Sequence, residues 1–240
     1  MGLGLFALSY MWWKSPFKIK PGFFKEVFLL GYPITIGLFF EVMAFCSVTL
    51  FVGKFHEIQT AANNIALNIA SLAFMIPLSI SAAVSVKVGH SYGERNYKNL
   101  QTFAEVSIFT SMCYTLLITV IFYFFPSFIL SIFTQDTLVL DWGKKLLLLV
   151  CCFQLFDGAQ VTLSGILRGI SVTRAPSIAI FTGYWIIGLP LGYFLAFHQG
   201  FEAQGFWIGL AVSLALVAMM LAVILRNKLT ALYPSAVNEH

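Results

Sequence analysis

Two acidic residues, Glu41 and Asp157, lie deep inside long apolar stretches of the sequence. Glu41 is 13 residues from the start of its stretch, and Asp157 is 10 residues from the end of its own. If both stretches are membrane helices, these offsets place the two carboxyl groups about 15 to 20 Å from the same side of the bilayer, near its midplane. An Asp at the centre of a membrane helix costs about 2.5 to 3.5 kcal/mol, and such residues usually face a bundle interior or a wet cavity.

The sequence predicts no basic residue at a comparable depth, so neither carboxylate is expected to have a cationic partner. A buried carboxylate without such a partner favours its neutral form, unless a metal ion supplies the missing charge. This behaviour is typical of a site that binds a proton or Na⁺. We therefore predict that Glu41 and Asp157 form such a site, with H⁺ or Na⁺ as the bound ion.

Polar side chains accompany both acidic residues. At about 100° per residue, one stripe on the helix of Asp157 also holds Gln154, Gln160 and Ser164. A second stripe, on the next apolar stretch after Glu41, holds Asn64, Asn68 and Ser71. Oxygen-rich stripes suit a hard cation or a wet cavity, but Asn, Gln and Ser also join membrane helices by hydrogen bonds. We favour the second interpretation for the Asn and Ser residues and the first for Glu41 and Asp157.

The composition requires that these apolar stretches be membrane spans. Of the 240 residues, 59% are hydrophobic and 10% are charged, with a mean hydropathy of +0.87. A soluble domain has about 25% charged residues, and a disordered chain combines low hydrophobicity with high net charge, so both classes are excluded. At roughly 20 apolar residues per crossing, the length allows six or seven helices. The predicted fold class is an all-α, polytopic membrane protein.

Six apolar stretches are long enough to span a bilayer. They are Phe28–Val52, Ala61–Val88, Phe103–Phe125, Leu138–Leu167, Ser177–Phe197 and Gln204–Leu225. A seventh stretch, Met1–Trp13, is too short to cross alone and looks like the second half of a helix. The predicted organisation is a truncated helix stub at 1–13, a cytoplasmic loop at 14–27, a six-helix transmembrane lobe at 28–225 and a cytoplasmic tail at 226–240.

The basic residues predict the orientation of the lobe. The loops of one side hold Lys14, Lys18, Lys20, Lys25, Lys87, Arg95, Lys98, Arg168, Arg174, Arg226 and Lys228. The loops of the other side hold Lys54, Lys144 and Lys145. Because cytoplasmic loops carry the excess of Lys and Arg, the first side is predicted to be cytoplasmic, with the C-terminus, in the cell (inner) membrane. Tryptophans near the predicted helix ends, as in an aromatic belt, are Trp12, Trp13, Trp142 and Trp207.

Other function classes find little support in the sequence. No nucleophile motif, phosphate-binding loop or His/Cys cluster appears, so we predict no enzyme and no cofactor apart from the bound H⁺ or Na⁺. The net charge of +4 lies mostly in loops, which argues against a nucleic-acid partner. The four cysteines lie in apolar stretches and are interpreted as small core residues. Gly183, Gly188 and Gly192 are predicted to let helices approach closely.

At these residues the sequence resembles the multidrug and toxin extrusion (MATE) family, in particular the C-terminal half of a NorM-type member. GYPITIGLFFEVMAF, at 31–45, resembles the seventh helix of the family, with Glu41 as its buried glutamate. AANNIALNIASLAFMIPLSISAAVSVKVGHSYG, at 61–93, is similar to the eighth helix and the loop after it. FQLFDGAQVTLSGILRGISVTRAPS, at 153–177, resembles the tenth helix with Asp157 at its acidic position, and GYWIIGLPLGYFL, at 183–195, resembles the eleventh.

The resemblance implies that Glu41 and Asp157 form a cation-coupling site in a C-terminal lobe. The polar residues predicted as candidates for the cavity wall are Gln154, Gln160, Ser164, Asn64, Asn68 and Tyr184. Members of the family export cationic amphiphilic compounds by alternating access, driven by an inward flow of H⁺ or Na⁺. The sequence departs from the family at Phe153, where some Na⁺-using members have Tyr, and in the loop 170–172, which is poorer in glycine.

The family has twelve helices in two lobes, and this sequence resembles the tail of helix 6 followed by helices 7 to 12. The expected partners are therefore the lipid bilayer, organic-cation substrates and an N-terminal six-helix lobe, supplied in cis or in trans. The alternative is a truncated or split half that transports nothing without that lobe. A weaker alternative is a flippase of lipid-linked sugars, which would need cationic cavity residues for the pyrophosphate. A membrane-embedded enzyme is weaker still, because no metal or nucleophile site accompanies the two acids.

Overall fold

The structure is a computed structural model, and it describes residues 22–237. Its elements are α2 (Phe23–Val52), α3 (Glu57–Gly93), α4 (Tyr97–Phe124), α5 (Pro126–Ser131), α6 (Thr137–Gly169), α7 (Arg174–Phe181), the π-helix η1 (Thr182–Gly188), α8 (Leu189–Phe197) and α9 (Ala203–Val237). Within residues 22–237 there is no strand, which confirms the all-α class. The stub predicted at 1–13 and most of the loop predicted at 14–27 lie outside the described residues.

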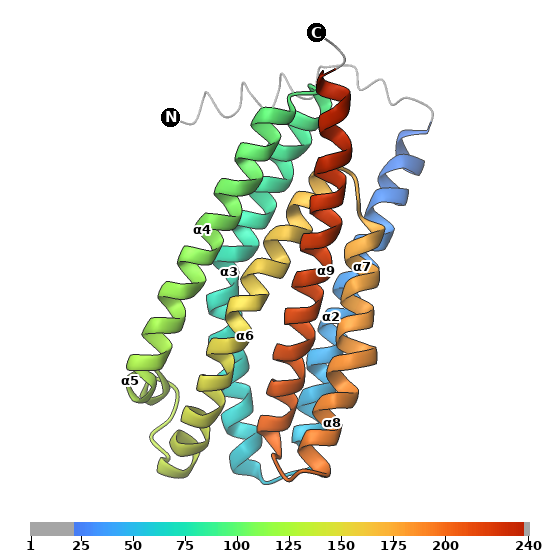
Figure 1. The fold of residues 1–240 in the computed structure, drawn as a ribbon. Helices are drawn as coiled ribbons and strands as arrows, with labels where there is room; N and C mark the ends of the chain where they lie inside the picture. Colours follow the sequence, from blue (N-terminus) through green and yellow to red (C-terminus); the bar gives the residue numbers. More distant parts are fainter. Residues whose placement is uncertain (1–21, 238–240) are drawn as a thin grey trace, which may run out of the picture.

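The six predicted membrane spans are confirmed as long apolar helices. They are Val27–Val52, Glu57–Gly93, Tyr97–Phe124, Thr137–Gly169, Arg174–Phe197 and Ala203–Leu232. The fifth span consists of α7, η1 and α8 in direct succession. The chain is therefore a multi-pass membrane protein whose helices run alternately up and down through the bundle (Figure 1).

The first and last helices extend beyond their apolar stretches. Helix α2 begins at Phe23, so the end of the loop predicted at 14–27 is helical. Helix α9 continues to Val237, so the tail predicted at 226–240 is helical as far as the structure describes it. The predicted ends followed hydropathy, which falls where Lys25 and Arg226 enter the sequence. Lys and Arg are good helix formers, and a helix therefore continues through them into the aqueous layer.

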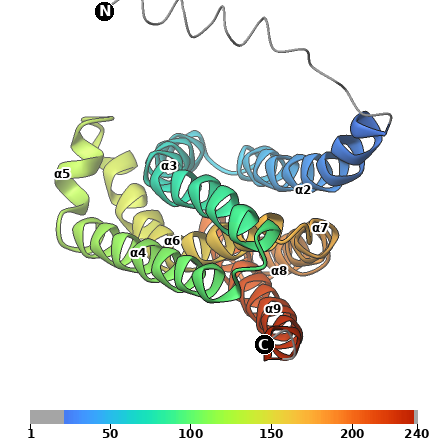
Figure 2. The same cartoon turned by 90° about the horizontal axis from the view of Figure 1, so that it is seen from above.

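Helix α6 is the centre of the bundle, and α2 stands at its edge. Helix α6 packs against α3, α4 and α9, and it lies among them in the view from above (Figure 2). In its most apolar window, 67% of α6 is buried inside the protein, against 17% of α2. Two hydrogen bonds tie α2 to the segment of α7 and η1. Ser177 Oγ donates to the carbonyl of Pro33 at 2.5 Å, and Trp185 Nε1 donates to the carbonyl of Phe40 at 3.0 Å.

The backbones of α8 and α9 touch where glycines face each other. A Cβ atom on Gly209 would lie 2.6 Å from the carbonyl oxygen of Gly188 and 2.6 Å from the amide nitrogen of Gly192. A Cβ atom on Gly183 would lie 2.1 Å from the side chain of Val217. At these points α9 lies close to the segment of η1 and α8, and the prediction that Gly183, Gly188 and Gly192 permit close approach is confirmed.

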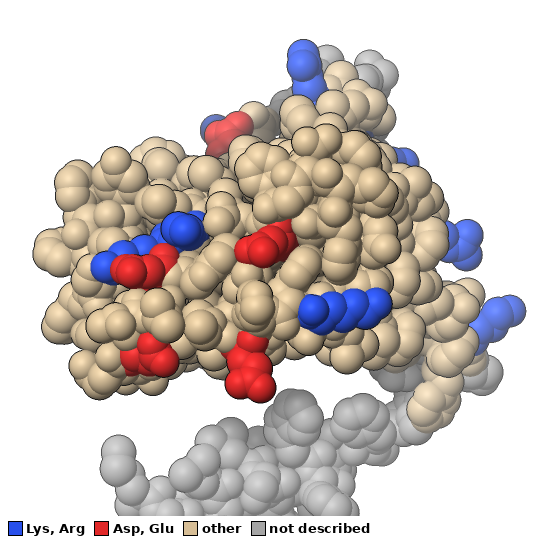
Figure 3. All heavy atoms as spheres, turned by 90° about the horizontal axis from the view of Figure 1, so that it is seen from below, with Lys and Arg blue, Asp and Glu red and all other residues tan. Residues whose placement is uncertain are grey.

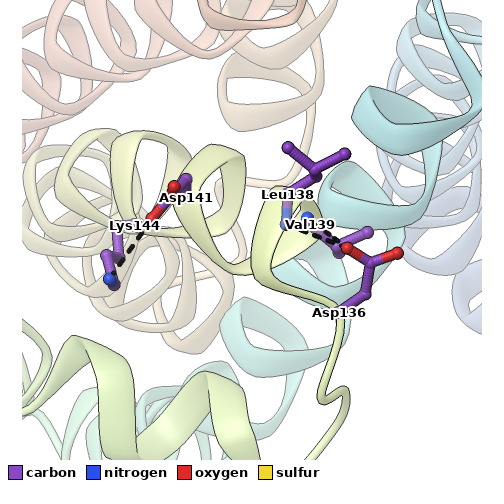
Figure 4. A network of polar contacts seen from close by, with 5 residues as sticks. All are labelled: Asp136, Leu138, Val139, Asp141 and Lys144. Carbon is purple, nitrogen blue, oxygen red and sulfur yellow. Dashed lines mark hydrogen bonds and ion pairs between the residues drawn. The ribbon is translucent and has the colours of Figure 1, made fainter.

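The end of the bundle away from the C-terminus carries acidic and basic side chains interspersed over an otherwise uncharged surface (Figure 3). The charged residues of its connections and adjoining first turns are Lys54, Glu57, Asp136, Asp141, Lys144, Lys145 and Glu202. Asp136 caps α6 by accepting hydrogen bonds from the backbone amides of Leu138 and Val139, at 2.9 and 3.4 Å (Figure 4). Asp141 pairs with Lys144 at 3.4 Å in the next turn. This end therefore has no excess of positive charge. The orientation of the lobe in the membrane stays a prediction.

The interpretation of Trp207 as an interfacial residue is wrong. Its side chain is fully buried, and its indole nitrogen donates to Oδ1 of Asn63 on α3 at 3.0 Å. A buried indole needs an acceptor, and Asn63 provides it inside the bundle. Trp142 does lie near the start of α6, half-buried, with Nζ of Lys145 4.7 Å from its ring centroid. Trp12 and Trp13 are outside the described residues.

Candidate cation site

Glu41 and Asp157 line one cavity of about 580 Å³ between α2, α3 and α6. Glu41 is half-buried on α2, and Asp157 is buried on α6 with 5% of its surface exposed. Helix α3 contributes Ser71 and Phe74 to the same wall. The two acidic residues are 116 positions apart in the chain, and their shared cavity agrees with the similar depths that helix geometry assigns to them. Their role in binding a cation stays a prediction.

The polar stripe around Asp157 is buried along α6. Gln154, Gln160 and Ser164 all have less than 5% of their surface exposed. Within the described residues, both amide atoms of Gln154, Oε1 of Gln160 and Oγ of Ser164 have no hydrogen-bond partner in the protein. Buried polar atoms in proteins are almost always paired with protein, water or an ion. The side of α6 around Asp157 is therefore suited to a hydrated or cation-bound environment.

The second stripe lies differently. Asn64 and Asn68 are exposed on α3, where Nδ2 of Asn68 donates to the carbonyl of Asn64 at 2.9 Å. Neither residue lines the cavity of Glu41 and Asp157, whereas Ser71 does. The buried amide on this part of α3 is Asn63, which is bonded to Trp207. Asn64 and Asn68 therefore do not line that cavity, although they are exposed on the same face of α3 as Ser71, about two turns and one turn away along the helix. Their place in a cavity wall stays a prediction.

Tyr184 is fully buried in the π-helix η1. Its ring lies 5.9 Å from that of Phe45 on α2, and its hydroxyl has no hydrogen-bond partner within the described residues. Single-turn π segments are frequent at functional sites, and Pro190 just beyond η1 favours irregular backbone because it cannot donate a helical hydrogen bond. Tyr184 lines neither of the two pockets that contain Glu41, but it packs against Phe45, which lines both. Its role in the cavity stays a prediction.

Arg168 is the residue that sequence reasoning misplaced. It was expected in a cytoplasmic loop, but it lies half-buried in the last turn of α6, where its Nη2 donates to Oγ of Ser81 on α3 at 2.8 Å. Arg168 and Glu41 line the same pocket. A cationic side chain thus borders the space in front of Glu41, which counting residues along the sequence did not predict. Long helical side chains point toward the helix N-terminus, so Arg168 reaches back from the end of α6 into the bundle.

This second pocket, of about 310 Å³, adjoins the first. The two share Glu41, Val42, Phe45, Ser71 and Phe74. The second pocket adds polar side chains toward the end of the bundle where α6 ends, namely Gln160, Ser164, Arg168, Thr173 and Ser177. A signal for Arg168 was present in the sequence, because positions 157, 160, 164 and 168 recur at the spacing of one helical face.

The arrangement offers oxygen atoms in a largely apolar enclosure. Within residues 22–237, no three His, Cys, Asp or Glu side chains come together, so the acidic ligands of the cavity number two. Carboxylate, amide and hydroxyl oxygens are the ligands that hard cations take in proteins, and a carboxylate also binds a proton. The aromatic rings of Phe45, Phe74 and Phe153 form much of the remaining wall. Chemically, the cavity suits one small cation beside an apolar surface.

Comparison with known proteins identifies relatives of the whole lobe. The MatE family model matches residues 33–194. "Multidrug resistance protein NorM" of Vibrio cholerae is 38% identical over 212 residues, which are 85% of this chain and 46% of that protein. "Probable multidrug resistance protein NorM" of Bacillus thuringiensis subsp. konkukian is 36% identical over 215 residues, which are 90% of this chain and 48% of that protein. The chain spans about half the length of the curated relatives it matches.

Solved structures show the same fold. The crystal structure of the eukaryotic MATE transporter AtDTX14 matches with a TM-score of 0.78 at 23% identity, over 87% of this chain and 48% of that one. The crystal structure of a MATE protein in the bent conformation matches with a TM-score of 0.84 at 18% identity, over 92% of this chain and 49% of that one. At these identities the likeness is one of architecture, and it extends over about half of each of those chains.

Proposed function

The chain belongs to the MatE family, and from that premise we propose that it is the C-terminal lobe of a cation-coupled multidrug efflux antiporter. The observation that carries the proposal is the cavity in which carboxylates of two membrane helices, Glu41 on α2 and Asp157 on α6, face the same space. Ionisable residues inside membrane spans mark ion pathways and proton relays.

In this proposal H⁺ or Na⁺ binds at Glu41 and Asp157 as the coupling ion. Because the two carboxylates belong to different helices, a cation that both bind favours one distance between α2 and α6. The cation therefore shifts the population of the lobe toward one arrangement of its helices. A bound substrate that favours the other arrangement weakens cation binding by the same factor, because coupling between sites is reciprocal.

The proposed substrates are cationic amphiphilic compounds. Phe45, Phe74 and Phe153 offer flat apolar surface, and the acidic residues attract positive charge. The proposed protein partner is an N-terminal six-helix lobe, joined in cis or supplied in trans. We place the protein in the cell (inner) membrane with its C-terminus in the cytoplasm, since basic residues are concentrated at that end of the spans.

The proposal is tested in a two-lobed version of the protein, expressed in a pump-deficient host. Glu41→Gln and Asp157→Asn are each expected to reduce cation-driven drug efflux at least about tenfold while insertion is retained. The matched control is Glu105→Gln, because Glu105 is an exposed carboxylate on α4 that bonds Gln101. Normal efflux from both cavity variants contradicts the proposal.

The alternative in which the lobe is inactive without its partner is decided by the same host. The 240-residue chain alone is compared with the chain fused to an N-terminal six-helix lobe. If the fusion exports the drug and the 240-residue chain does not, the lobe needs a partner lobe for transport. If the 240-residue chain exports the drug by itself, this alternative is wrong.

Export of lipid-linked sugars is the second candidate function, and Arg168 is the observation that favours it. A pyrophosphate needs cationic cavity residues, and Arg168 lies inside the pocket of Glu41. However, the acidic residues of the same pockets oppose an anionic substrate, so we rank this candidate second. Transport assays with a pyrophosphate-linked sugar lipid and with an organic cation distinguish the two.

A further inference from the structure

We propose that Arg168 is a fixed counter-charge to Glu41. In this view Ser81 holds its guanidinium on the predicted cytoplasmic side of the cation site, and the positive charge keeps the affinity for the coupling cation low. The inference rests on the proposed function, since it assigns a role to a residue beside the proposed cation site.

The position of Arg168 follows from the face of α6 that carries Asp157. Gln160, Ser164 and Arg168 continue that face over 11 residues, which is about 16 Å of helix. The side chain of Arg168 spans part of this interval, because it points back toward Asp157 and not out along the helix. The second pocket, where Gln160, Ser164 and Arg168 meet Glu41, is the space into which it extends.

Ser81 holds the guanidinium by a hydrogen bond and is itself fixed. Its Oγ accepts from Arg168 at 2.8 Å and donates to the carbonyl of Val161 at 2.6 Å. Ser81 is fully buried against Gly165, where a Cβ atom would lie 2.4 Å from its Oγ. The contact between α3 and α6 thus determines where the positive charge stands.

Arg168 acts on Glu41 from a distance. In the part of the chain that the structure describes, no hydrogen bond or direct ion pair joins their side chains, although both line the second pocket. The carboxylate oxygens of Glu41 thus stay available as ligands for the coupling cation. The positive charge of Arg168 nearby lowers the affinity of the site for that cation. A site built in this way binds its cation weakly and releases it readily.

Few other charges face Glu41. Asp157 on α6 lines the first pocket with Glu41, and Tyr184 on η1 packs against Phe45, which lines both pockets. Helix α3 contributes the neutral Ser71 to both pockets, and α7 contributes the neutral Ser177. Within the described residues, Arg168 is thus the cation that lines a pocket with Glu41.

The test measures cation affinity of the purified chain in lipid nanodiscs, with Na⁺ titrated at constant ionic strength against K⁺ and with H⁺ titrated without Na⁺. Tryptophan fluorescence is the readout, and the part due to Trp185 is found by difference from Trp185→Phe, because the indole of Trp185 is bonded to the carbonyl of Phe40, next to Glu41 on α2. Arg168→Gln is expected to tighten cation binding about three- to tenfold, as removal of a nearby positive charge predicts. Arg168→Lys keeps the charge and is expected to stay within about twofold of the parent.

Ser81→Ala tests the hold on the guanidinium. Once freed, Arg168 can pair directly with Glu41, so we expect this variant to weaken cation binding about threefold or more. In an Arg168→Gln background the same change is expected to have no effect, because no guanidinium is left to move. The matched control for Arg168→Gln is Arg174→Gln, because Arg174 is an exposed arginine at the same end of the bundle and lines neither of the two pockets.

The outcomes separate the two proposals. If neither cation binds to the parent, or if binding survives both Glu41→Gln and Asp157→Asn, the proposed function fails. If the parent binds a cation through these acids but Arg168→Gln weakens binding or leaves it unchanged, the counter-charge inference is overturned. General structural damage weakens binding, so a gain in affinity is a result that damage does not produce. If Arg168→Gln does not insert, an unchanged affinity in Ser81→Ala overturns the inference by itself.

Discussion

The two acids of the cavity stand on helices of opposite character. Helix α6, which carries Asp157, is 67% buried in its most apolar window and is packed by α3, α4 and α9. Helix α2, which carries Glu41, is 17% buried there and stands at the edge of the bundle. A helix enclosed on several sides has little room to move, whereas an edge helix can change its distance from the core. We infer that the site has a fixed half on α6 and a movable half on α2.

Changing the side-chain length of each acidic residue, Asp to Glu or Glu to Asp, is expected to give the largest difference in efflux between the two halves of the site. Asp157→Glu adds a methylene group to the packed wall of α6, and we expect cation-driven efflux of the two-lobed protein to fall about tenfold or more. Glu41→Asp removes one from α2, and we expect a loss of less than about threefold because α2 can move to compensate. Efflux assays check both, and equal losses contradict the distinction.

Glycine replacement compares the packing of the same two helices. A Cβ atom on Gly165 of α6 would lie 2.5 Å from the backbone oxygen of Ser81, whereas one on Gly31 of α2 would meet nothing within 4 Å. Gly165→Ala is therefore expected to lower the free energy of unfolding by about 1 to 3 kcal/mol. Gly31→Ala is its matched control, expected to be neutral or slightly stabilising. Unfolding in mixed detergent micelles measures both, and similar values for the two would refute the contrast.

Thiol labelling compares access to the two helices. Cys46 is exposed on α2 and lines the cavity, whereas Cys151 is buried on α6. In a background with the exposed Cys113 and Cys152 changed to Ser, we expect a membrane-permeant maleimide to modify Cys46 about tenfold faster than Cys151, because modification follows access to the thiolate. Mass spectrometry over time gives the rates. Labelling of Cys151 at an equal rate would show that α6 opens as easily as α2.

The smallest expected effect concerns the attachment of α2. Trp185→Phe removes the indole N–H that donates to the carbonyl of Phe40, and we expect a loss of about 1 kcal/mol in unfolding free energy. Trp142→Phe, at the start of α6, is a control without a bond to α2. Hydrogen exchange is expected to quicken in α2 and to stay unchanged in α6. An unchanged rate in α2 means that the bond does not restrain it.

The helices of this protein follow from hydropathy, because a membrane span needs a long apolar stretch whatever it packs against. The depth of Glu41 and Asp157 follows from counting residues along a helix, and the structure places them in one cavity as that count suggests. Which face of one helix packs against which face of the next does not follow from hydropathy or from counting residues. Which of two adjacent amides turns inward, Asn63 or Asn64, depends on the rotation of α3 against α9, where Trp207 needs an acceptor.

Arg168 shows a second limit of sequence reasoning. Counting charged residues as loop residues works for short side chains, but an arginine side chain reaches several ångströms from its backbone. The last turn of a helix can therefore be at the membrane surface while its guanidinium is inside the bundle. Whether the guanidinium lies inside the bundle or at the membrane surface depends on its partner on another helix, here Ser81. That pairing joins residues 87 positions apart, which no local pattern reveals.

The glycines between α8 and α9 also limit how the lobe can change shape. Sliding between packed helices works by side chains hopping from one rotamer to another, and where Gly209 lies against Gly188 and Gly192 there are no side chains to do so. We therefore expect α8 and α9 to shift together near these glycines. A change in the cavity is then expected to come from another part of the lobe, and the edge helix α2, attached to α7 and η1 by hydrogen bonds, is the element suited to it.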